Sequence, residues 1–253
     1  MTPANLFCTL LFQKRVPIKS IFLPSLALFF IALCSSSAAT PNQLTAEEKA
    51  AGWKLLFDGK TTNGWRSFKK TSFPARGWVV EDGWLHCLGN GGGDIITDAE
   101  FDDFELEWEW KQAPGGNSGL KYFVTETRDS ALGHEYQMID NDGEPDAKQA
   151  GGKRVTASFY DVLKLDRAAA PDPPGETNHS RILVQGDHVE HWLNGLKVLE
   201  YSCSSDALKT AVAQSKFKDV PGFGDKIKGH LLLQDHHSEV WFRSLKLRPL
   251  PPK

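Results

Sequence analysis

Four consecutive polar residues near the end of the chain, Gln234, Asp235, His236 and His237, carry groups that can transfer protons or bind a polar ligand. The segments on either side of them are short and rich in Leu, Val, Trp and Phe, which favours buried strands over helices. His236 is the candidate general base, because an imidazole titrates near neutral pH, where proton transfer is most effective. Each of these side chains alone could equally belong to a solvated turn, so the prediction of a site rests on the block as a whole.

A second group of candidates lies on a predicted strand that presents a carboxylate and an amide side by side. Strand alternation places Tyr136 and Met138 on one face and Glu135 and Gln137 on the other. A buried Glu135 can serve as the base or can protonate a departing oxygen, and the sequence leaves the assignment of acid and base open. Gln137 and Asn117 are candidates to orient the hydroxyl or carbonyl groups of a substrate.

A reaction that develops an oxyanion needs a positive charge or a hydrogen-bond donor that is already in place. Arg243 is the first candidate, because alternation with Leu245 and Leu247 would put it on their face, where an arginine needs a partner or an opening. The alternative is a structural ion pair between Arg243 and Asp235 or Glu239.

Further residues are candidates for substrate binding. Gln234 and Asp235 adjoin the candidate base. Lys216 lies near the glycines of a flexible loop and can close over a ligand, although lysines in such loops are often simply solvated. Trp192 can stack on a sugar ring, or it can pack within the fold as most tryptophans of a β-protein do.

A divalent metal ion is an alternative to a cationic side chain. Asp235, His236 and Glu135 offer ligand atoms that could gather around an ion once the chain is folded, which their spacing neither shows nor excludes. The segment 140–143 lacks the glycine and glutamate spacing of a calcium-binding loop. No cofactor is indicated with certainty.

The elements that must position these residues are short strands. Apolar and acidic residues alternate over 104–110, which predicts a strand with a core face and a solvated acidic face. Asp-Gly and Asn-Gly pairs predict tight turns in a hairpin over 78–87 and a meander over 181–201. A capping box at 45–48 and a cap at Ser205 predict two short helices. The pattern favours an all-β fold, a jelly-roll sandwich of two antiparallel sheets with one or two short peripheral helices.

The first 39 residues are typical of a secretory signal segment, and we expect one domain over 40–253. Three basic residues precede an apolar run over 21–33, and small residues at 37–39 form a cleavage site. The apolar run is too short to favour a membrane span, and the bulky residue before Cys34 argues against lipid anchoring there. We therefore expect a secreted or periplasmic protein.

Charge and cysteine content narrow the classes of partner. Removal of the signal segment takes away three basic residues and no acidic ones, so the net charge of −3 becomes −6. Basic stripes with interleaved aromatic residues are absent from the sequence, which argues against a nucleic-acid partner. Cys87 and Cys203 remain in the exported part, and the sequence decides neither whether they pair nor whether the chain forms oligomers.

Six motifs occur in an order that resembles the 3-keto-disaccharide hydrolase family, long catalogued as a domain of unknown function. They are Leu56–Gly59, Asn117–Gly119, Glu135–Gln137, His191–Gly195, Ser215–Lys218 and Leu233–His236. The resemblance spans roughly residues 53–250 and implies a concanavalin A-like jelly roll, export and activity on oxidised sugars. The chain departs from the family pattern at Thr177, where a Trp usually precedes Asn178, and at His237, where a Gly usually stands.

The leading hypothesis is an exported enzyme that cleaves 3-keto glycosides by proton abstraction, elimination and hydration. His236, Glu135 and Arg243 would carry proton transfer and charge stabilisation, and the partner would be a carbohydrate. One alternative is a lectin-like module that binds sugars without turnover. Another is a conventional glycosidase that uses Glu135 with Asp235 or Glu107 as a carboxylate pair.

Overall fold

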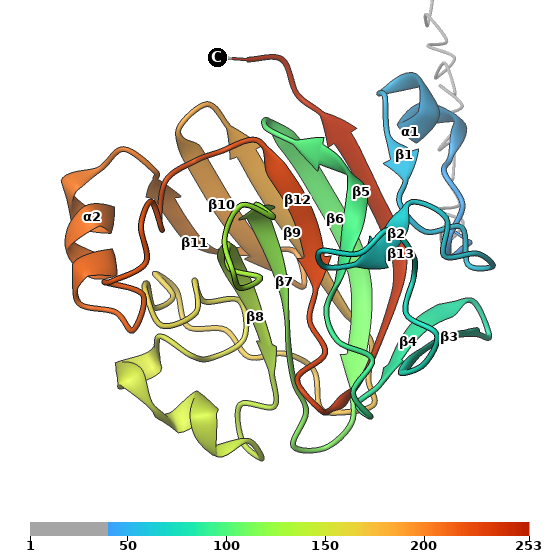
Figure 1. Ribbon diagram of the computed structural model, residues 1–253, viewed down its shortest axis with the longest axis horizontal. Coiled ribbons are helices and arrows are strands. Elements are labelled where there is room, and N and C mark those ends of the chain that lie inside the picture. The colour runs from blue at the N-terminus through green and yellow to red at the C-terminus, as the bar shows by residue number, and fades with distance from the viewer. Residues whose placement is uncertain (1–39, 253) are drawn as a thin grey trace, which may run out of the picture. The chain divides into compact units, whose positions relative to one another are not determined.

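A computed structural model describes residues 40–252, which form two antiparallel β-sheets with short helices at their edges (Figure 1). This arrangement confirms the prediction of an all-β jelly-roll sandwich. The predicted signal segment, residues 1–39 with Cys34, lies outside the described residues, so secretion and the position of cleavage stay predictions.

The strands divide between an eight-stranded and a five-stranded sheet. The larger sheet contains β1 (Lys54–Leu55), β3 (Trp78–Glu81), β4 (Trp84–Leu88), β6 (Phe104–Gln112), β9 (Asn178–Gln185), β10 (His188–Leu193), β11 (Leu196–Ser202) and β13 (Glu239–Pro249). The smaller sheet contains β2 (Trp65–Ser67), β5 (Ile95–Phe101), β7 (Asn117–Val124), β8 (His134–Ile139) and β12 (Gly229–Leu233). The smaller sheet lies in front in Figure 1 and the larger one behind it.

The order of strands in each sheet differs from their order along the chain. The larger sheet runs β11-β10-β9-β6-β13-β4-β3, with β1 paired to β13, and the smaller runs β2-β5-β12-β7-β8. The last two strands therefore occupy interior positions: β12 lies between β5 and β7, and β13 lies between β6 and β4.

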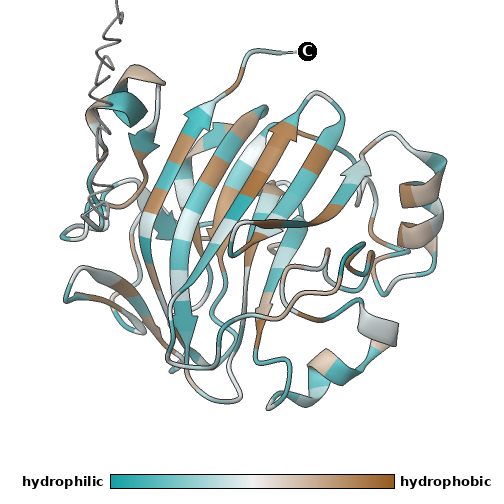
Figure 2. Ribbon diagram, turned by 180° about the vertical axis from the view of Figure 1, so that it is seen from behind, coloured by the Kyte–Doolittle hydropathy of each residue, from teal (hydrophilic) through white to brown (hydrophobic). Residues whose placement is uncertain are grey.

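The core lies between the two sheets, because one face of each strand is apolar. In β6, Phe104, Leu106, Trp108 and Trp110 are buried in the main core cluster, while the glutamates between them face away from it. The same alternation appears as bands of hydrophilic and hydrophobic residues along the larger sheet in Figure 2. The period-two pattern in the sequence thus predicted both the strand and its orientation.

The predicted turns and caps are also confirmed. Asp82 and Gly83 connect β3 to β4 with φ of 48° and 77°, the left-handed geometry of a tight hairpin turn. The helix α1 (Ala46–Ala50) begins with the capping box at Thr45, and α2 (Asp206–Ala213) begins with the Ser205 side chain as its cap. Two short 3-10 helices, η1 (Pro145–Lys148) and η2 (Ala150–Gly152), follow β8.

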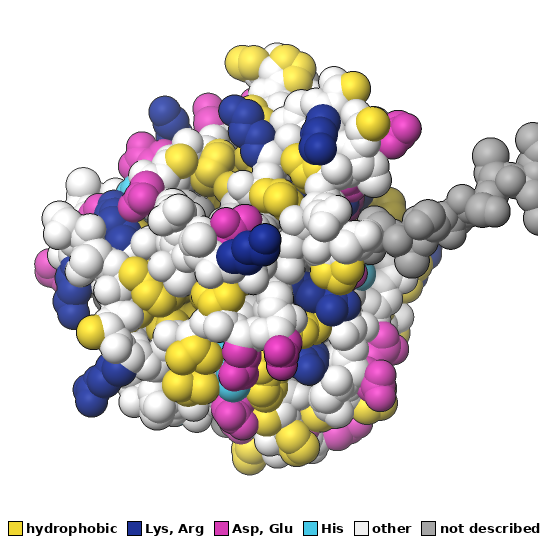
Figure 3. Space-filling view, turned by 90° about the vertical axis from the view of Figure 1, so that its right-hand side faces the viewer, with side chains coloured by type: hydrophobic (Ala, Val, Ile, Leu, Met, Phe, Trp, Pro, Cys, Tyr) yellow, Lys and Arg dark blue, Asp and Glu magenta, His cyan; other side chains and the backbone are white. Residues whose placement is uncertain are grey.

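Neither the helices of the described residues nor the surface shown in Figure 3 indicates a membrane-spanning segment or a patch of a single charge. Within residues 40–252, no helix combines the length and hydropathy that a membrane span requires. Figure 3 shows one side of the molecule, where basic, acidic and hydrophobic side chains are interspersed.

Cys87 and Cys203 are free thiols, and burial raises the pKa of each to about 12, so both stay protonated at neutral pH.

Candidate active site

The outer face of the five-stranded sheet carries a patch of polar side chains across β7 and β8. Residues that point into the core alternate on these strands with residues that face outward. The register pairs Lys121 with Glu135 and Gly119 with Gln137, which places all four positions on the outer face. Glu135 and Gln137 therefore lie side by side, as the alternation predicted.

Lys121 and Glu135 form a buried ion pair at the centre of this patch. Each residue is 6% exposed, and Lys121 Nζ lies 3.8 Å from Glu135 Oε2. The same ammonium donates a hydrogen bond to the carbonyl oxygen of Ala131 at 3.3 Å. A buried ion pair commonly stabilises a fold no better than apolar residues of similar volume, so its presence marks a candidate functional site.

Gly119 leaves the space that the Glu135 carboxyl group occupies. A Cβ atom at position 119 would lie 2.4 Å from Glu135 Oε1, closer than real Cβ atoms come to any neighbour. The backbone of Gly119 has a negative φ, so the absence of a side chain, rather than the backbone conformation, is what this position requires. The glycine of the Asn117–Gly119 motif thus serves the carboxylate on the neighbouring strand.

The surroundings of Glu135 favour its protonated form. Burial raises the pKa of Glu135, and the negative charge of Asp94 acts in the same direction. The positive charges of Lys121, Lys216 and His236 oppose this effect without cancelling it. A carboxyl group with a raised pKa can exchange protons closer to neutral pH, which is what a general acid or base requires.

Three predicted binding amides adjoin the ion pair. Gln137 Nε2 donates to Asn117 Oδ1 at 3.4 Å, and both side chains are buried. The backbone N–H of Gln234 donates to the carbonyl of Gly119 at 3.0 Å, which extends the ladder beyond β12 and holds Gln234 beside β7. The structure therefore brings the Asn117 and Gln137 amides into contact and places the backbone of Gln234 beside the same strand.

Asp235 fixes the turn that carries the two histidines. Its carboxylate accepts hydrogen bonds from the backbone N–H of Gly93 at 2.9 Å and of His237 at 3.1 Å. Its own N–H donates to Asp94 Oδ1 at 3.0 Å. Asp235 therefore acts in this structure as a positioning residue, and the glycine-rich segment 89–93 contributes one of its partners.

His236 is exposed beside this turn, and its charge influences the pKa of both Asp94 and Glu135. The structure therefore places the predicted imidazole and the predicted carboxyl group in one electrostatic neighbourhood. His237, also exposed, has φ of 61°, a conformation that favours glycine. This geometry explains why glycine suits the position, and the histidine adopts it at some cost in strain.

Lys216 approaches the same neighbourhood from the loop after α2. Its Nζ lies 4.1 Å from the centre of the Tyr160 ring, and its backbone N–H donates to Asp161 Oδ2 at 2.8 Å. Protein atoms around this otherwise exposed residue lower the pKa of Lys216 by desolvation, while the negative charge of Glu135 acts against that effect. The predicted binding role of Lys216 is consistent with this placement.

The prediction that Arg243 shares a face with Leu245 and Leu247 is wrong. The register between β13 and β6 shifts between Arg243 and Lys246, and Ser244 within the shift has φ of 52°. Such a bulge reverses the alternation, so the two leucines stay in the core while Arg243 faces outward.

Arg243 belongs to the outer face of the eight-stranded sheet. Its Nε donates to Glu109 Oε2 at 2.5 Å, and its guanidinium lies 4.2 Å from the centre of the Trp84 ring. Glu135 lies on the other sheet, so the structure does not bring Arg243 to the predicted site. The ion-pair alternative describes this residue, with Glu109 as the partner instead of Asp235 or Glu239.

Trp192 and Glu107 also lie on the outer face of the larger sheet. The Trp192 ring is covered by the Arg181 guanidinium at 4.7 Å, and its Nε1 donates to Glu190 Oε2. Glu107 pairs with Lys246 at 3.0 Å. Neither residue is brought to Glu135, so the fold argues against Trp192 as a sugar contact and against Glu107 as the second acid of a carboxylate pair.

The described residues contain one group of three His, Cys or carboxylate donors within 4.8 Å of one another, namely His188, Glu190 and Glu200. Lys197 already pairs with both glutamates of this group. The predicted trio Asp235, His236 and Glu135 does not form such a group.

Two residues of the patch were missed by the sequence analysis. Lys121 lies on the same strand face as Asn117, so the alternation that paired Glu135 with Gln137 could have found it. Asp94 precedes Ile95 of β5, and its proximity to Asp235 follows only from the pairing of β5 with β12. Asp94 therefore carried no local signal.

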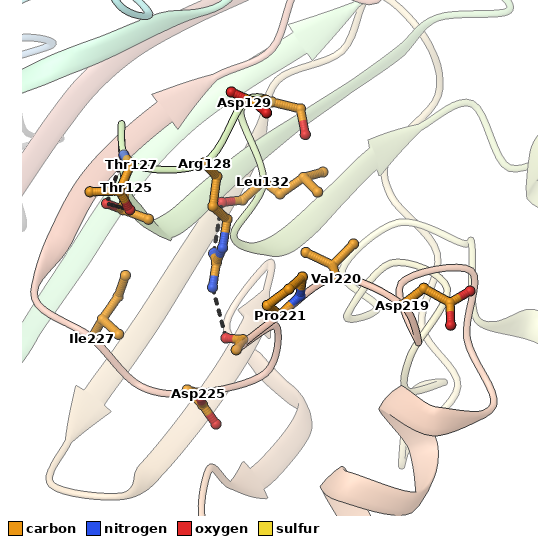
Figure 4. A pocket seen from close by; sticks show the side chains of 12 residues that line it. Thr125, Thr127, Arg128, Asp129, Leu132, Asp219, Val220, Pro221, Asp225 and Ile227 are labelled. Atoms are coloured by element: carbon orange, nitrogen blue, oxygen red, sulfur yellow. Dashed lines mark hydrogen bonds between the residues drawn. The ribbon is translucent and has the colours of Figure 1, made fainter.

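A cavity of about 710 Å³ lies between the loops over 125–132 and 219–227 (Figure 4). Arg128 joins the two loops by donating to the carbonyls of Gly222 at 2.7 Å and Leu132 at 3.4 Å. None of the predicted site residues lines this cavity. It borders the patch only through the loop that contains Ala131, the acceptor for Lys121.

The sequence is similar to those of known proteins. Residues 52–248 match the family described as the 3-keto-alpha-glucoside-1,2-lyase-like domain. The chain belongs to this family. It is 35% identical over 247 residues to a 3-keto-disaccharide hydrolase of Bacteroides thetaiotaomicron, covering 85% of this chain and 84% of that protein.

Solved structures of similar proteins agree with this membership. A crystal structure from Parabacteroides distasonis, provisionally assigned as a glycosyl hydrolase, has a TM-score of 0.77 and 35% identity over 84% of this chain and 100% of that chain. A second one from the same organism has a TM-score of 0.61 and 27% identity, and covers 78% and 99% of the two chains. Together with the family membership, these relatives identify the chain as a carbohydrate-active hydrolase.

Proposed function

We propose that this member of the 3-keto-alpha-glucoside-1,2-lyase-like domain family is an exported enzyme that hydrolyses 3-keto glycosides by elimination followed by hydration. The observation that carries the proposal is the buried Glu135, whose pKa is raised and which faces outward among cationic and amide side chains. The similarity to a 3-keto-disaccharide hydrolase supports the choice of substrate class.

The proposed chemistry begins at the ketone on carbon 3, which acidifies the hydrogen on carbon 2. A base removes that proton, and the electron pair forms an enolate whose oxygen carries the negative charge. Collapse of the enolate breaks the bond from carbon 1 to the glycosidic oxygen, which leaves with a proton from an acid. Water then adds across the resulting enone, so the net reaction consumes one water and releases the two sugar parts.

Glu135 and His236 divide the proton transfers in this proposal. The raised pKa of Glu135 suits a group that gives or takes a proton, and the imidazole of His236 offers a second proton-transfer group beside it. Lys216 takes the role of electrophile that the sequence suggested for Arg243, since its positive charge acts at Glu135. The amides of Asn117, Gln137 and Gln234 would hold the sugar hydroxyl groups.

The substrate class can be tested with the mature protein, residues 40–253. One sample is incubated with a 3-keto disaccharide and a second with the unoxidised parent sugar. We expect release of monosaccharides from the oxidised sugar alone. Turnover of the unoxidised parent would instead indicate a conventional glycosidase, and saturable binding without turnover would indicate a sugar-binding module. Either result would overturn the proposal.

The role of His236 has a matched control in its neighbour. His236→Ala should lower kcat by about 100-fold or more, the usual contribution of a general acid or base. His237→Gly relieves the strained backbone at an equally exposed histidine and should retain activity. Full activity of His236→Ala would remove this residue from the mechanism.

Export is a separate part of the proposal and rests on the signal-like residues 1–39. Expression of the whole gene in a Gram-negative host should place the mature protein in the periplasmic fraction, with Thr40 at its N-terminus by mass spectrometry. A lipid-modified Cys34 or an uncleaved cytoplasmic chain would contradict it.

A further inference from the structure

Lys121 is held firmly within the patch but has no place in the proton transfers described above. Its ammonium has three protons to donate, of which the Ala131 carbonyl accepts one at 3.3 Å. Glu135 Oε2 lies 3.8 Å away, beyond hydrogen-bond distance but within direct electrostatic range. The charge of Lys121 is therefore fixed in position and acts on the carboxyl group across the strand pair.

Asp94 approaches Lys121 from the other side. Ile96 of β5 and Lys121 of β7 both pair in register with Leu232 of β12, so they lie on the same outer face of the sheet. Asp94 lies two residues before Ile96, and alternation puts it on that face as well. The backbone N–H of Asp235 holds one Asp94 oxygen at 3.0 Å. Burial raises the pKa of Asp94, and the positive charge of Lys121 acts against that effect. The Lys121 ammonium thus acts on two carboxyl groups, those of Asp94 and Glu135.

The two carboxyl groups of this cluster influence each other. The negative charge of Asp94 raises the pKa of Glu135, and the ammonium of Lys121 lowers the pKa of both groups. The other groups that face Glu135 are Lys216 from the loop after α2, His236 from the turn after β12, and the Tyr160 hydroxyl. Lys216 and His236 lie on exposed segments, whereas Lys121 is buried on a rigid strand.

We propose that Lys121 and Asp94 are positioning residues that set, with opposite sign, the protonation state in which Glu135 meets its substrate. Lys121 holds Glu135 toward the ionised form, and Asp94 holds it toward the protonated form. The balance of these two opposing effects contributes to setting the pKa of Glu135. This inference extends the acid–base role of Glu135 and rests on the proposed function for its biological meaning.

The test measures the titration of Glu135 directly, without substrate. Protein labelled with ¹³C at the glutamate carboxyl carbon is titrated by NMR, and the Glu135 signal is identified by its loss in Glu135→Gln. Lys121→Met removes the positive charge and should raise the pKa of Glu135 by about one unit or more. Asp94→Asn removes the negative charge and should lower it.

Controls separate a charge effect from a general disturbance. Lys121→Arg keeps the positive charge and should return the titration toward that of the native protein. Lys111→Met removes a lysine on β6, on the sheet that does not carry Glu135, and should leave the titration unchanged. If Lys121→Met does not fold, Asp94→Asn and Lys121→Arg still carry the test.

The pH dependence of kcat/KM should move in the same directions as the NMR titration. Unchanged titration in both variants, or shifts of the same sign, would overturn the inference. Opposite shifts in a protein that fails to cleave the 3-keto disaccharide would leave the inference standing and remove the proposed function instead.

Discussion

The outer faces of the two sheets carry the same kinds of charged residue but arrange them differently. On the eight-stranded sheet every acidic side chain of β6 has a basic side chain within 3.5 Å: Glu105 has Arg181 and Arg248, Glu107 has Lys246 and His179, and Glu109 has Arg243. On the five-stranded sheet the single ammonium of Lys121 lies among Glu135 and Asp94. The difference teaches that direct hydrogen bonds between opposite charges, more than the presence of charge, separate a structural face from a chemical one.

The two faces also shift their carboxyl groups in opposite directions. Burial alone would raise the pKa of Glu107, but hydrogen bonds from His179 and Lys246 outweigh it and lower the pKa to about 2. Burial dominates at Glu135 and raises its pKa. Glu107 is therefore locked in its ionised form near neutral pH, whereas Glu135 can exchange its proton.

The comparison is tested most severely by replacing one glutamate on each face. Glu135→Gln keeps the shape of the side chain but removes the exchangeable proton, so kcat/KM on a 3-keto disaccharide should fall by about 100-fold or more. Glu107→Gln makes the same change on the other sheet and should leave kcat/KM within about twofold, because surface substitutions away from a site act mainly on stability. Equal losses would show that the two faces do not differ in function.

Gly119→Ala tests the outer face of the five-stranded sheet, because it disturbs the position of Glu135 without removing its carboxyl group. The added methyl group would displace the Glu135 carboxyl group, so we expect a loss of about 10-fold to 100-fold in kcat/KM, since small misplacements of a reacting group have effects of this size. Gly229→Ala on β12 would meet the backbone carbonyl of Val124 at 2.7 Å instead. That control should lower the unfolding midpoint in urea while the folded fraction keeps its activity.

The opposite pKa shifts predict opposite pH effects on stability. The pKa of Glu107 is lowered from 4.5 to about 2, so its contribution is present above about pH 4.5 and is lost as the pH falls toward 2. Glu107→Gln should therefore cost roughly 2 to 3 kcal/mol near pH 7 and much less near pH 3.

At Glu135 the effect of pH on the free energy of unfolding has the opposite sign. Because its pKa is raised in the folded state, the stability that it contributes is present below 4.5 and is lost as the pH rises through its folded pKa. The stability of Glu135→Gln relative to the native protein should therefore improve as the pH rises above about 4.5. Urea denaturation at several pH values measures both variants, and parallel pH profiles would contradict the contrast.

The smallest effect is expected at Arg243. The Arg243–Glu109 pair is about one-quarter exposed on each side, and partly exposed pairs contribute little. Together with the contact to Trp84, its removal in Arg243→Ala should lower stability by about 1 kcal/mol and leave kcat unchanged. A large loss of kcat with normal stability would restore Arg243 as a catalytic candidate.

The sequence predicted the elements of the fold because their signals are local. Alternation identified the faces of β6 and β8, the Asp82-Gly83 pair identified the hairpin, and Thr45 and Ser205 marked the helix starts. Each of these signals spans only a few neighbouring residues. No knowledge of distant strands was needed to read them.

The parts that failed depend on contacts between distant strands. Arg243 was misplaced because a bulge, set by the pairing of β13 with β6, reverses the period of two. Asp94 was overlooked because it meets Asp235 only after β5 and β12 pair, across 141 residues of chain. His236 and Glu135 were chosen for their chemistry, and their common neighbourhood likewise became visible only in the folded chain.

The interior positions of β12 and β13 determine when this chain can finish folding. A nascent chain that still lacks residues 229–253 has neither the strand between β5 and β7 nor the one between β6 and β4, so both sheets are split. Such distant pairings also form slowly. Neither sheet can therefore be completed before the final two strands have left the ribosome.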